Sequence, residues 1–362
     1  MYPGEGYRYN QQMGCSFALG GKTIMLLSID GGGMRGLIPA LVLRNIRDRL
    51  RTRGADAGFH RLFHMMAGTS TGGLICLALS LPAANPERPG VFMASPALSI
   101  DDVVDLYEEE GPNIFPPTVF RGLRRVEQVF REKYDSDPVR GLYGKVFGGA
   151  TLKHSLCHLL IPSYDVERQT VFLFKHRPLR KDRTTSDPDF FLRDVAMATA
   201  AAPTYFAPAA VEPVGGGPSR YLLDGGLYAN NPSLCCYIEA KKTFPRAGNL
   251  FILSLGTGTF NRGYSHREVR GWGYLEWVSP GRGVPLFSLM TGAQSECVDH
   301  QLEKLPGVTY LRLNGPLEER CELDDAGPRA MRVLRRAAGR IIEENDAALE
   351  RACGMLVSGR SR

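Results

Sequence analysis

The sequence lacks an apolar run long enough to cross a membrane. The longest run, residues 74–84, is interrupted by Ser80 and falls well short of the roughly 20 residues that a spanning helix needs. Residues 1–20 have neither the basic start nor the apolar stretch of a secretory signal peptide. We therefore expect a cytoplasmic protein whose contact with membranes is peripheral.

The chain also lacks metal-binding cysteine patterns and long runs of positive charge. Its eight cysteines include no C-x-x-C pair and no Cys/His spacing typical of zinc sites, so we expect buried thiols in a reducing compartment. The net charge of +6 is spread along the chain. That distribution argues against binding to a nucleic acid polymer and is compatible with contact with an anionic membrane surface.

What remains is the composition of a globular protein. The 362 residues are 43% apolar and 23% charged, without repeats or low-complexity blocks, which is enough to bury a substantial core. No linker separates two domains. We predict an N-terminal tail over residues 1–22 and a single domain over residues 23–362 that includes a C-terminal helical segment.

Strand, turn and helix occur twice before residue 80, which is the opening of an α/β domain. The continuous apolar run at residues 23–29 is typical of a parallel strand covered on both faces, and a helical stripe follows over residues 37–50. Further strands are predicted at residues 170–174, 221–223 and 250–255, and helices at 151–160, 192–202 and 329–357. Residues 81–96 are predicted to be an exposed loop.

The second of these corners, Gly68-Thr69-Ser70-Thr71-Gly72, has the pattern G-x-S-x-G. Glycines on both sides of Ser70 allow a sharp turn that leaves the hydroxyl exposed above the sheet. The amides at the start of the next helix would face any oxyanion formed there. In isolation, an ordinary strand-to-helix corner explains the pattern equally well.

The first corner, Asp30-Gly31-Gly32-Gly33-Met34-Arg35-Gly36, matches the dinucleotide-binding pattern G-x-G-x-x-G. That pattern expects an acidic residue at the end of the next strand, where this chain has Ala67-Gly68. The cofactor interpretation therefore fails. A glycine-rich loop at a helix start still offers free backbone amides, which suit an anionic tetrahedral intermediate.

A nucleophilic serine needs a base. In α/β-hydrolases the chain order is Ser, Asp, His, and only His266 and His300 follow Asp224, neither of them at the end of a predicted strand. Asp224-Gly225-Gly226 does close a predicted strand, and its glycines let a reacting group approach the carboxylate. Asp224 is thus a candidate direct base for Ser70, with a Ser-His-Asp esterase that uses His266 or His300 as the alternative.

These three motifs, in this order and each at a strand end, resemble those of the patatin-like phospholipase family: a glycine-rich oxyanion motif, a serine elbow and an Asp-Gly-Gly motif. The flanking segments at residues 198–206, 227–232 and 253–259 agree. The resemblance implies a three-layer α/β/α fold with a mainly parallel central sheet. It also implies a Ser70–Asp224 dyad that cleaves acyl esters of phospholipids or lysophospholipids through an acyl-enzyme.

By position, the resemblance implies an oxyanion hole at Gly31, Gly32 and Gly33, with Arg35 bracing the loop or the anion. Asp30 is interpreted as fixing the loop, and neither a metal nor a cofactor is implied. The remaining motif residues are Gly36, Gly68, Gly72, Gly225 and Gly226.

The single-domain size also resembles stand-alone bacterial patatins, some of which are antiphage effectors switched on by cyclic nucleotides. No residue here identifies a nucleotide pocket, and a non-catalytic lipid-binding protein and the oligomeric state also stay open. Residues 271–290 hold both tryptophans, Trp272 and Trp277. They are predicted to be either a membrane-contacting lid or, by the usual burial of large apolar residues, part of the core.

Overall fold

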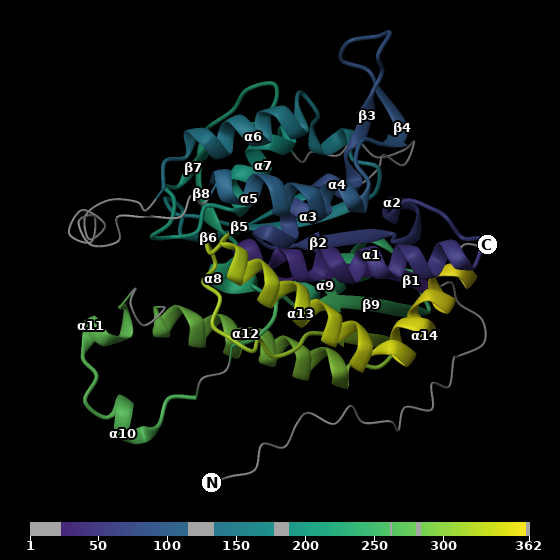
Figure 1. Ribbon diagram of the computed structural model, residues 1–362. Helices are drawn as coiled ribbons and strands as arrows, with labels where there is room; N and C mark the ends of the chain where they lie inside the picture. Colours follow the sequence, from purple (N-terminus) through teal and green to yellow (C-terminus); the bar gives the residue numbers. More distant parts are fainter. Residues whose placement is uncertain (1–22, 115–133, 177–187, 261–262, 280–283, 360–362) are drawn as a thin grey trace.

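One mixed sheet of eight strands organises the protein in the computed structural model (Figure 1). The structure describes residues 23–114, 134–176, 188–260, 263–279 and 284–359. The sheet order is β10 (Val308–Leu313), β9 (Asn249–Leu255), β1 (Thr23–Ile29), β2 (Met65–Gly68), β5 (His158–Asp165), β8 (Arg220–Asp224) and β7 (Ala209–Val211), with β6 (Thr170–His176) also paired to β5. The pairings from β10 to β5 are all parallel, while β6 and β8 run antiparallel to β5. The predicted mainly parallel central sheet is confirmed.

Helices cover both faces of the sheet because β1 is apolar on both sides. Leu27 and Ile29 belong to one buried cluster, and Ile24 and Leu26 belong to a second one. The first cluster is closed by α1 (Leu37–Thr52) and α3 (Thr71–Ser80), with α13 (Pro328–Glu344) and α14 (Asp346–Ser358) packed on α1. The second is closed by α9 (Ser233–Thr243) and α12 (Pro285–Lys304). This is the three-layer α/β/α arrangement that the sequence predicted.

A set of short helices packs on the α3 side of the sheet, near the carboxyl end of β2. It consists of α4 (Ile100–Asp105), η2 (Leu106–Glu110), α5 (Gly111–Ile114), α6 (Asp137–Phe147) and α7 (Leu192–Thr199). A capping box starts α4: the Ser99 amide donates to the Asp102 carboxylate (2.7 Å), and the Asp102 amide donates to Ser99 Oγ (3.2 Å).

Three sequence predictions differ from the structure. The helix predicted over residues 151–160 is wrong: a short turn, η4 (Leu152–His154), leads directly into β5. Leu159, Leu160 and Ile161 are fully buried within the sheet, and a short apolar run of a central strand has no period that separates it from a helix. The predicted loop at residues 81–96 contains a hairpin, β3 (Pro82–Ala84) and β4 (Phe92–Pro96), and the predicted C-terminal helix is divided into α13 and α14.

Within residues 271–290, the exposed side chains of α11 (Tyr274–Trp277) and of the start of α12 do not fit the core interpretation, and residues 280–283 lie outside the described ranges. Here α10 (His266–Val269) and α11 project from the body of the molecule, at the lower left of Figure 1. Tyr274 is 79% exposed and Leu275 75% exposed. The two tryptophan rings pack on each other, with centroids 4.9 Å apart.

Four further sequence predictions concern cysteines, membrane spans, the N-terminal tail and the domain organisation. The seven cysteines in the described ranges are free thiols, but Cys297 is exposed, so the prediction of buried thiols is wrong there. Within those ranges, no helix combines the length and the apolarity that crossing a membrane requires. The predicted tail at residues 1–22 lies outside the described residues, and a single domain over residues 23–362 stays a prediction.

Candidate active site

Ser70 lies at the corner between β2 and α3 with a strained backbone. Its φ of 54° is uncommon for a residue with a side chain, and its amide donates to Thr199 Oγ1 (3.0 Å). The flanking glycines are required. A Cβ on Gly68 would lie 2.2 Å from the carbonyl oxygen of Gly72, and one on Gly72 would lie 2.2 Å from that of Ile29. The G-x-S-x-G sequence therefore folds as the predicted elbow.

Asp224 ends β8 and is only 5% exposed. Its Oδ1 accepts a hydrogen bond from the Gly226 amide (2.7 Å). Burial raises the pKa of Asp224 to about 6, although interactions with the Ser70 hydroxyl and the Gly226 amide act to lower it. No charged side chain in the described ranges contributes to that pKa. A carboxylate with such a pKa can accept a proton near neutral pH.

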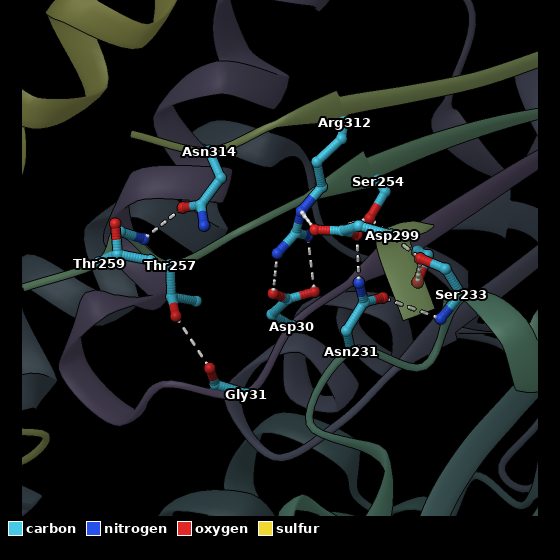
Figure 2. A network of polar contacts seen from close by, with 12 residues as sticks. Asp30, Gly31, Asn231, Ser233, Ser254, Thr257, Thr259, Asp299, Arg312 and Asn314 are labelled. Carbon is cyan, nitrogen blue, oxygen red and sulfur yellow. Dashed lines mark hydrogen bonds and ion pairs between the residues drawn. The ribbon is translucent and has the colours of Figure 1, made fainter. Parts of the chain in front are cut away.

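Asp30 is also buried, at 3% exposure, but it faces a cation. The Arg312 guanidinium donates to both carboxylate oxygens of Asp30, with distances of 2.9 Å from Nη1 and 2.5 Å from Nη2 (Figure 2). Asp30 is not among the residues that line the cavity described below. This geometry agrees with the interpretation that Asp30 fixes the glycine loop.

The glycine loop presents two free amides, not three. The Gly31 amide already donates to the carbonyl oxygen of Asn230 (3.0 Å), so Gly31 does not fit the donor role that the sequence suggested. Within the described part of the chain, the amides of Gly32 and Gly33 have no hydrogen-bond partner. Arg35 braces this loop, because its Nε donates to the carbonyl oxygen of Gly32 (3.4 Å).

These groups meet in one cavity. Its lining includes Ser70, Asp224, Gly226, Arg35 and the loop Gly31-Gly32-Gly33. The wall opposite is apolar and comes from α4, η2 and α6, with Val103, Leu106, Val139, Leu142, Val146 and Phe147. Of the other predicted motif residues, Gly36, Gly68, Gly72 and Gly225 lie behind the cavity surface, where a Cβ would meet atoms within 2.6 Å. Polar groups at one end and an apolar wall suit an acyl ester.

Histidines do not contribute to this cavity. All seven lie in the described ranges, and none is among its lining residues. His266 on α10 and His300 on α12 are both exposed. In the same ranges, no group of three or more His, Cys, Asp and Glu side chains is arranged to hold a metal ion.

Sequence reasoning missed several residues that the fold brings to the site. Thr199 Oγ1 accepts a hydrogen bond from the Ser70 amide, Leu323 lines the cavity, and Arg312 pairs with Asp30. Only Arg312 carried a usable signal. It is the one charged residue within the strand sequence Val-Thr-Tyr-Leu-Arg-Leu, and a charged side chain is rarely buried unless it is paired.

Comparison with known proteins identifies the family of this chain. The family model for patatin-like phospholipases matches residues 27–234, which include all three motifs. Patatin-like protein 2 of Arabidopsis thaliana is 35% identical over 309 residues, covering 78% of this chain and 72% of that one. Probable inactive patatin-3-Kuras 1 of Solanum tuberosum is 31% identical over 306 residues, covering 79% and 76%.

Among solved structures, VipD from Legionella pneumophila aligns over 89% of this chain and 67% of its own, with 13% identity and a TM-score of 0.39. The family assignment rests on the sequence comparisons: the model spans more than half of the chain, and the Arabidopsis relative is matched over most of its length. With its motifs in the family's order, this chain belongs to the patatin-like phospholipase family.

Proposed function

We propose that this protein is a serine lipid acyl hydrolase in which Ser70 is the nucleophile and Asp224 the base. One observation carries the proposal: Ser70 and a buried Asp224, with a pKa raised to about 6, line the same apolar-walled cavity. Family membership alone is not sufficient, because one relative bears the name "probable inactive".

The proposed reaction follows from these positions. Ser70 Oγ attacks the acyl carbonyl carbon while Asp224 takes the hydroxyl proton, and the amides of Gly32 and Gly33 donate to the resulting oxyanion. Collapse of this intermediate breaks the ester bond, and Asp224 gives its proton to the departing alcohol. Water then attacks the acyl-enzyme with Asp224 again accepting a proton, which releases the fatty acid and regenerates Ser70.

Arg35 supports a phospholipid or lysophospholipid as the substrate. Its side chain lines the cavity, and no carboxylate in the described ranges lies within ion-pair distance of it. A guanidinium without an ion-pair partner suits the phosphate of a lipid head group. The head group and the acyl position are not assigned.

The exposed end of α12 supports peripheral action at a membrane. Leu286, Leu289 and Met290 are 45–57% exposed, while Phe287 and Thr291 on the same turns line the cavity. An apolar surface continuous with the cavity would let a lipid move from the bilayer to Ser70. Replacing Leu289 with Asp should slow hydrolysis of vesicles more than that of a soluble ester. The matched control is Ile238→Asp on α9, which is 60% exposed.

Mass spectrometry of the products tests the main proposal. Mixed phospholipids are incubated with the wild-type protein, with Ser70→Ala, and with His266→Ala and His300→Ala as controls. We expect fatty acid release by the wild-type protein and both histidine variants, and none by Ser70→Ala. Equal release by the wild-type protein and Ser70→Ala would refute the enzyme proposal and favour a lipid-binding protein. A large loss in either histidine variant would favour the triad. The cyclic-nucleotide alternative stays a prediction without an assigned residue.

A further inference from the structure

Arg312 joins structural elements that are far apart in the sequence. It lies on β10, beyond the segment that the family model matches, and its side chain is 14% exposed. Besides its two hydrogen bonds to Asp30, Nη1 donates to Ser254 Oγ (3.0 Å), and Nε lies 3.4 Å from Asp299 Oδ2 (Figure 2). The guanidinium therefore links β1, β9 and α12.

On one side of Arg312 lies the loop that offers the free amides. The Asp30 amide donates to the carbonyl oxygen of Leu255 (3.0 Å), and the carbonyl oxygen of Gly31 accepts from Thr257 Oγ1 (2.8 Å). These contacts fix the two residues that immediately precede Gly32. Arg312 adds an ion pair to these hydrogen bonds, because its guanidinium contacts the Asp30 carboxylate. The ion pair limits rotation of the loop about the end of β1.

On the other side lies the segment that follows Asp-Gly-Gly. Asp299 Oδ1 accepts from Asn231 Nδ2 (2.9 Å) and from the Tyr310 hydroxyl (2.6 Å). The backbone amide of Asn231 donates to Gln294 Oε1 (3.1 Å). Asp299 therefore connects Arg312 to Asn231, which lies in the segment that follows Asp224. One buried guanidinium thus sits between the loop of the proposed oxyanion donors and the loop of the proposed base.

We propose that Arg312 is a positioning residue for acyl transfer, which fixes the Gly32 and Gly33 amides through Asp30 and the base segment through Asp299. The inference rests on the proposed function. Arg312 does not line the cavity and so does not touch the substrate. Arg312 therefore stabilises the transition state, in which the oxyanion forms, and does not contribute to binding of the ester. Its loss should therefore lower kcat and leave KM nearly unchanged.

The test uses the full chain and a soluble short-chain p-nitrophenyl ester. Arg312→Met should lower kcat about 10²–10³-fold, the effect of losing one oxyanion donor, and slow the reaction of Ser70 with a fluorophosphonate to a similar extent. Arg312→Lys keeps the charge but not the two-point contact, so its kcat should be intermediate. The matched control is Arg49→Met. Arg49 is 16% exposed and pairs with Asp346 and Glu350, away from the cavity. This control should leave kcat unchanged.

A second variant separates positioning from loss of the fold. Asp30→Asn/Arg312→Gln removes both charges of the Asp30–Arg312 pair, so neither partner stays buried without the other. Asp299, which is 26% exposed, keeps its hydrogen bonds from Asn231 and Tyr310. The melting temperature should therefore return toward that of the wild-type protein. We expect kcat to stay low. Recovery of kcat together with the melting temperature, or a kcat for Arg312→Met within about threefold of wild type, would overturn the inference while the proposed function stands. If wild-type turnover does not depend on Ser70, the proposed function fails and the inference falls with it.

Discussion

Asp30 and Asp224 occupy the same local sequence but different electrostatic environments. Asp30 directly follows β1 and Asp224 is the last residue of β8. Each is followed by two glycines, and each is at most 5% exposed. Asp30 receives two hydrogen bonds from the buried Arg312. Among the described residues no cation faces Asp224, which interacts with the Ser70 hydroxyl and the Gly226 amide, and burial raises its pKa to about 6.

The difference shows what separates a structural carboxylate from a proposed catalytic one. Burial raises the pKa of Asp30 as well, but the Arg312 guanidinium acts against that shift and occupies both carboxylate oxygens. The Asp30 carboxylate is therefore engaged in an ion pair, which a substrate or a nucleophile would have to displace. Burial without a cation leaves Asp224 available as a base near neutral pH. A strand end followed by Gly-Gly supplies a rigid position for either role. The residue that faces the carboxylate decides which role it takes.

The largest expected effect is on catalysis at Asp224. Asp224→Asn should lower turnover about 10²–10⁴-fold, because the amide cannot act as a general base. Its free energy of unfolding at pH 7.5 should not fall, and should rise by on the order of 1–3 kcal/mol, because the variant removes a buried charge whose pKa is raised. Ester hydrolysis and urea denaturation measure the two effects. A marked loss of stability with turnover retained would reverse the roles of the two carboxylates.

Asp30→Asn, unlike Asp224→Asn, should lower the free energy of unfolding. Removal of this partner leaves the Arg312 guanidinium buried without its main counter-ion, which costs about 3–5 kcal/mol of the free energy of unfolding. Urea denaturation of Asp30→Asn beside Asp224→Asn provides the comparison. If the two variants are equally stable, the Asp30–Arg312 pair does not differ from Asp224 in its contribution to folding.

The pH dependence of the wild-type protein sharpens the contrast. Asp224 must be ionised to act, so kcat/KM should fall about tenfold per pH unit below about pH 6. This acidic limb of the pH profile reports the pKa of Asp224 in the protein without bound substrate. Because the raised pKa favours the protonated form in the folded state, ionised Asp224 destabilises the fold above pH 6. The stability gained in Asp224→Asn should therefore disappear as the pH falls toward 4. A limb near pH 4 in kcat/KM would exclude Asp224 as the base with this pKa.

The smallest effect concerns the first glycine after each carboxylate. A Cβ on Gly225 would lie 2.6 Å from backbone atoms of Pro162, whereas a Cβ on Gly31 would lie 2.6 Å from the side-chain oxygen of Asn230. A side chain can move and a strand backbone cannot, so Gly225→Ala should lose about 1–3 kcal/mol and Gly31→Ala less. Asn230→Ala should restore the stability of Gly31→Ala. Thermal denaturation of the three variants checks the order, and equal losses for the two glycine variants would contradict it.

The prediction from sequence succeeded where the chain specifies its own local geometry. The serine elbow needs only two glycines around Ser70, and β1 needs only a continuous apolar run, so both were predicted in place. Prediction failed for β5, because its apolar residues are buried by neighbouring strands and carry no period of their own. For the aromatic residues around Trp277 the sequence left a lid and core packing open, because large apolar residues are usually buried. The projection of α11 from the body does not fit core packing there.

The sequence by itself therefore determined the family, the mainly parallel sheet and the positions of Ser70, Asp30 and Asp224 at strand ends. Tertiary structure alone decided that Gly31 is already hydrogen-bonded, that the histidines lie outside the cavity, and that Arg312 faces Asp30 and not Asp224. The physical reason is how far apart in the sequence the interacting residues lie. Backbone turns depend on neighbouring residues, whereas the charge state of a buried carboxylate depends on whichever side chain the fold brings to it, here from a residue 282 positions away.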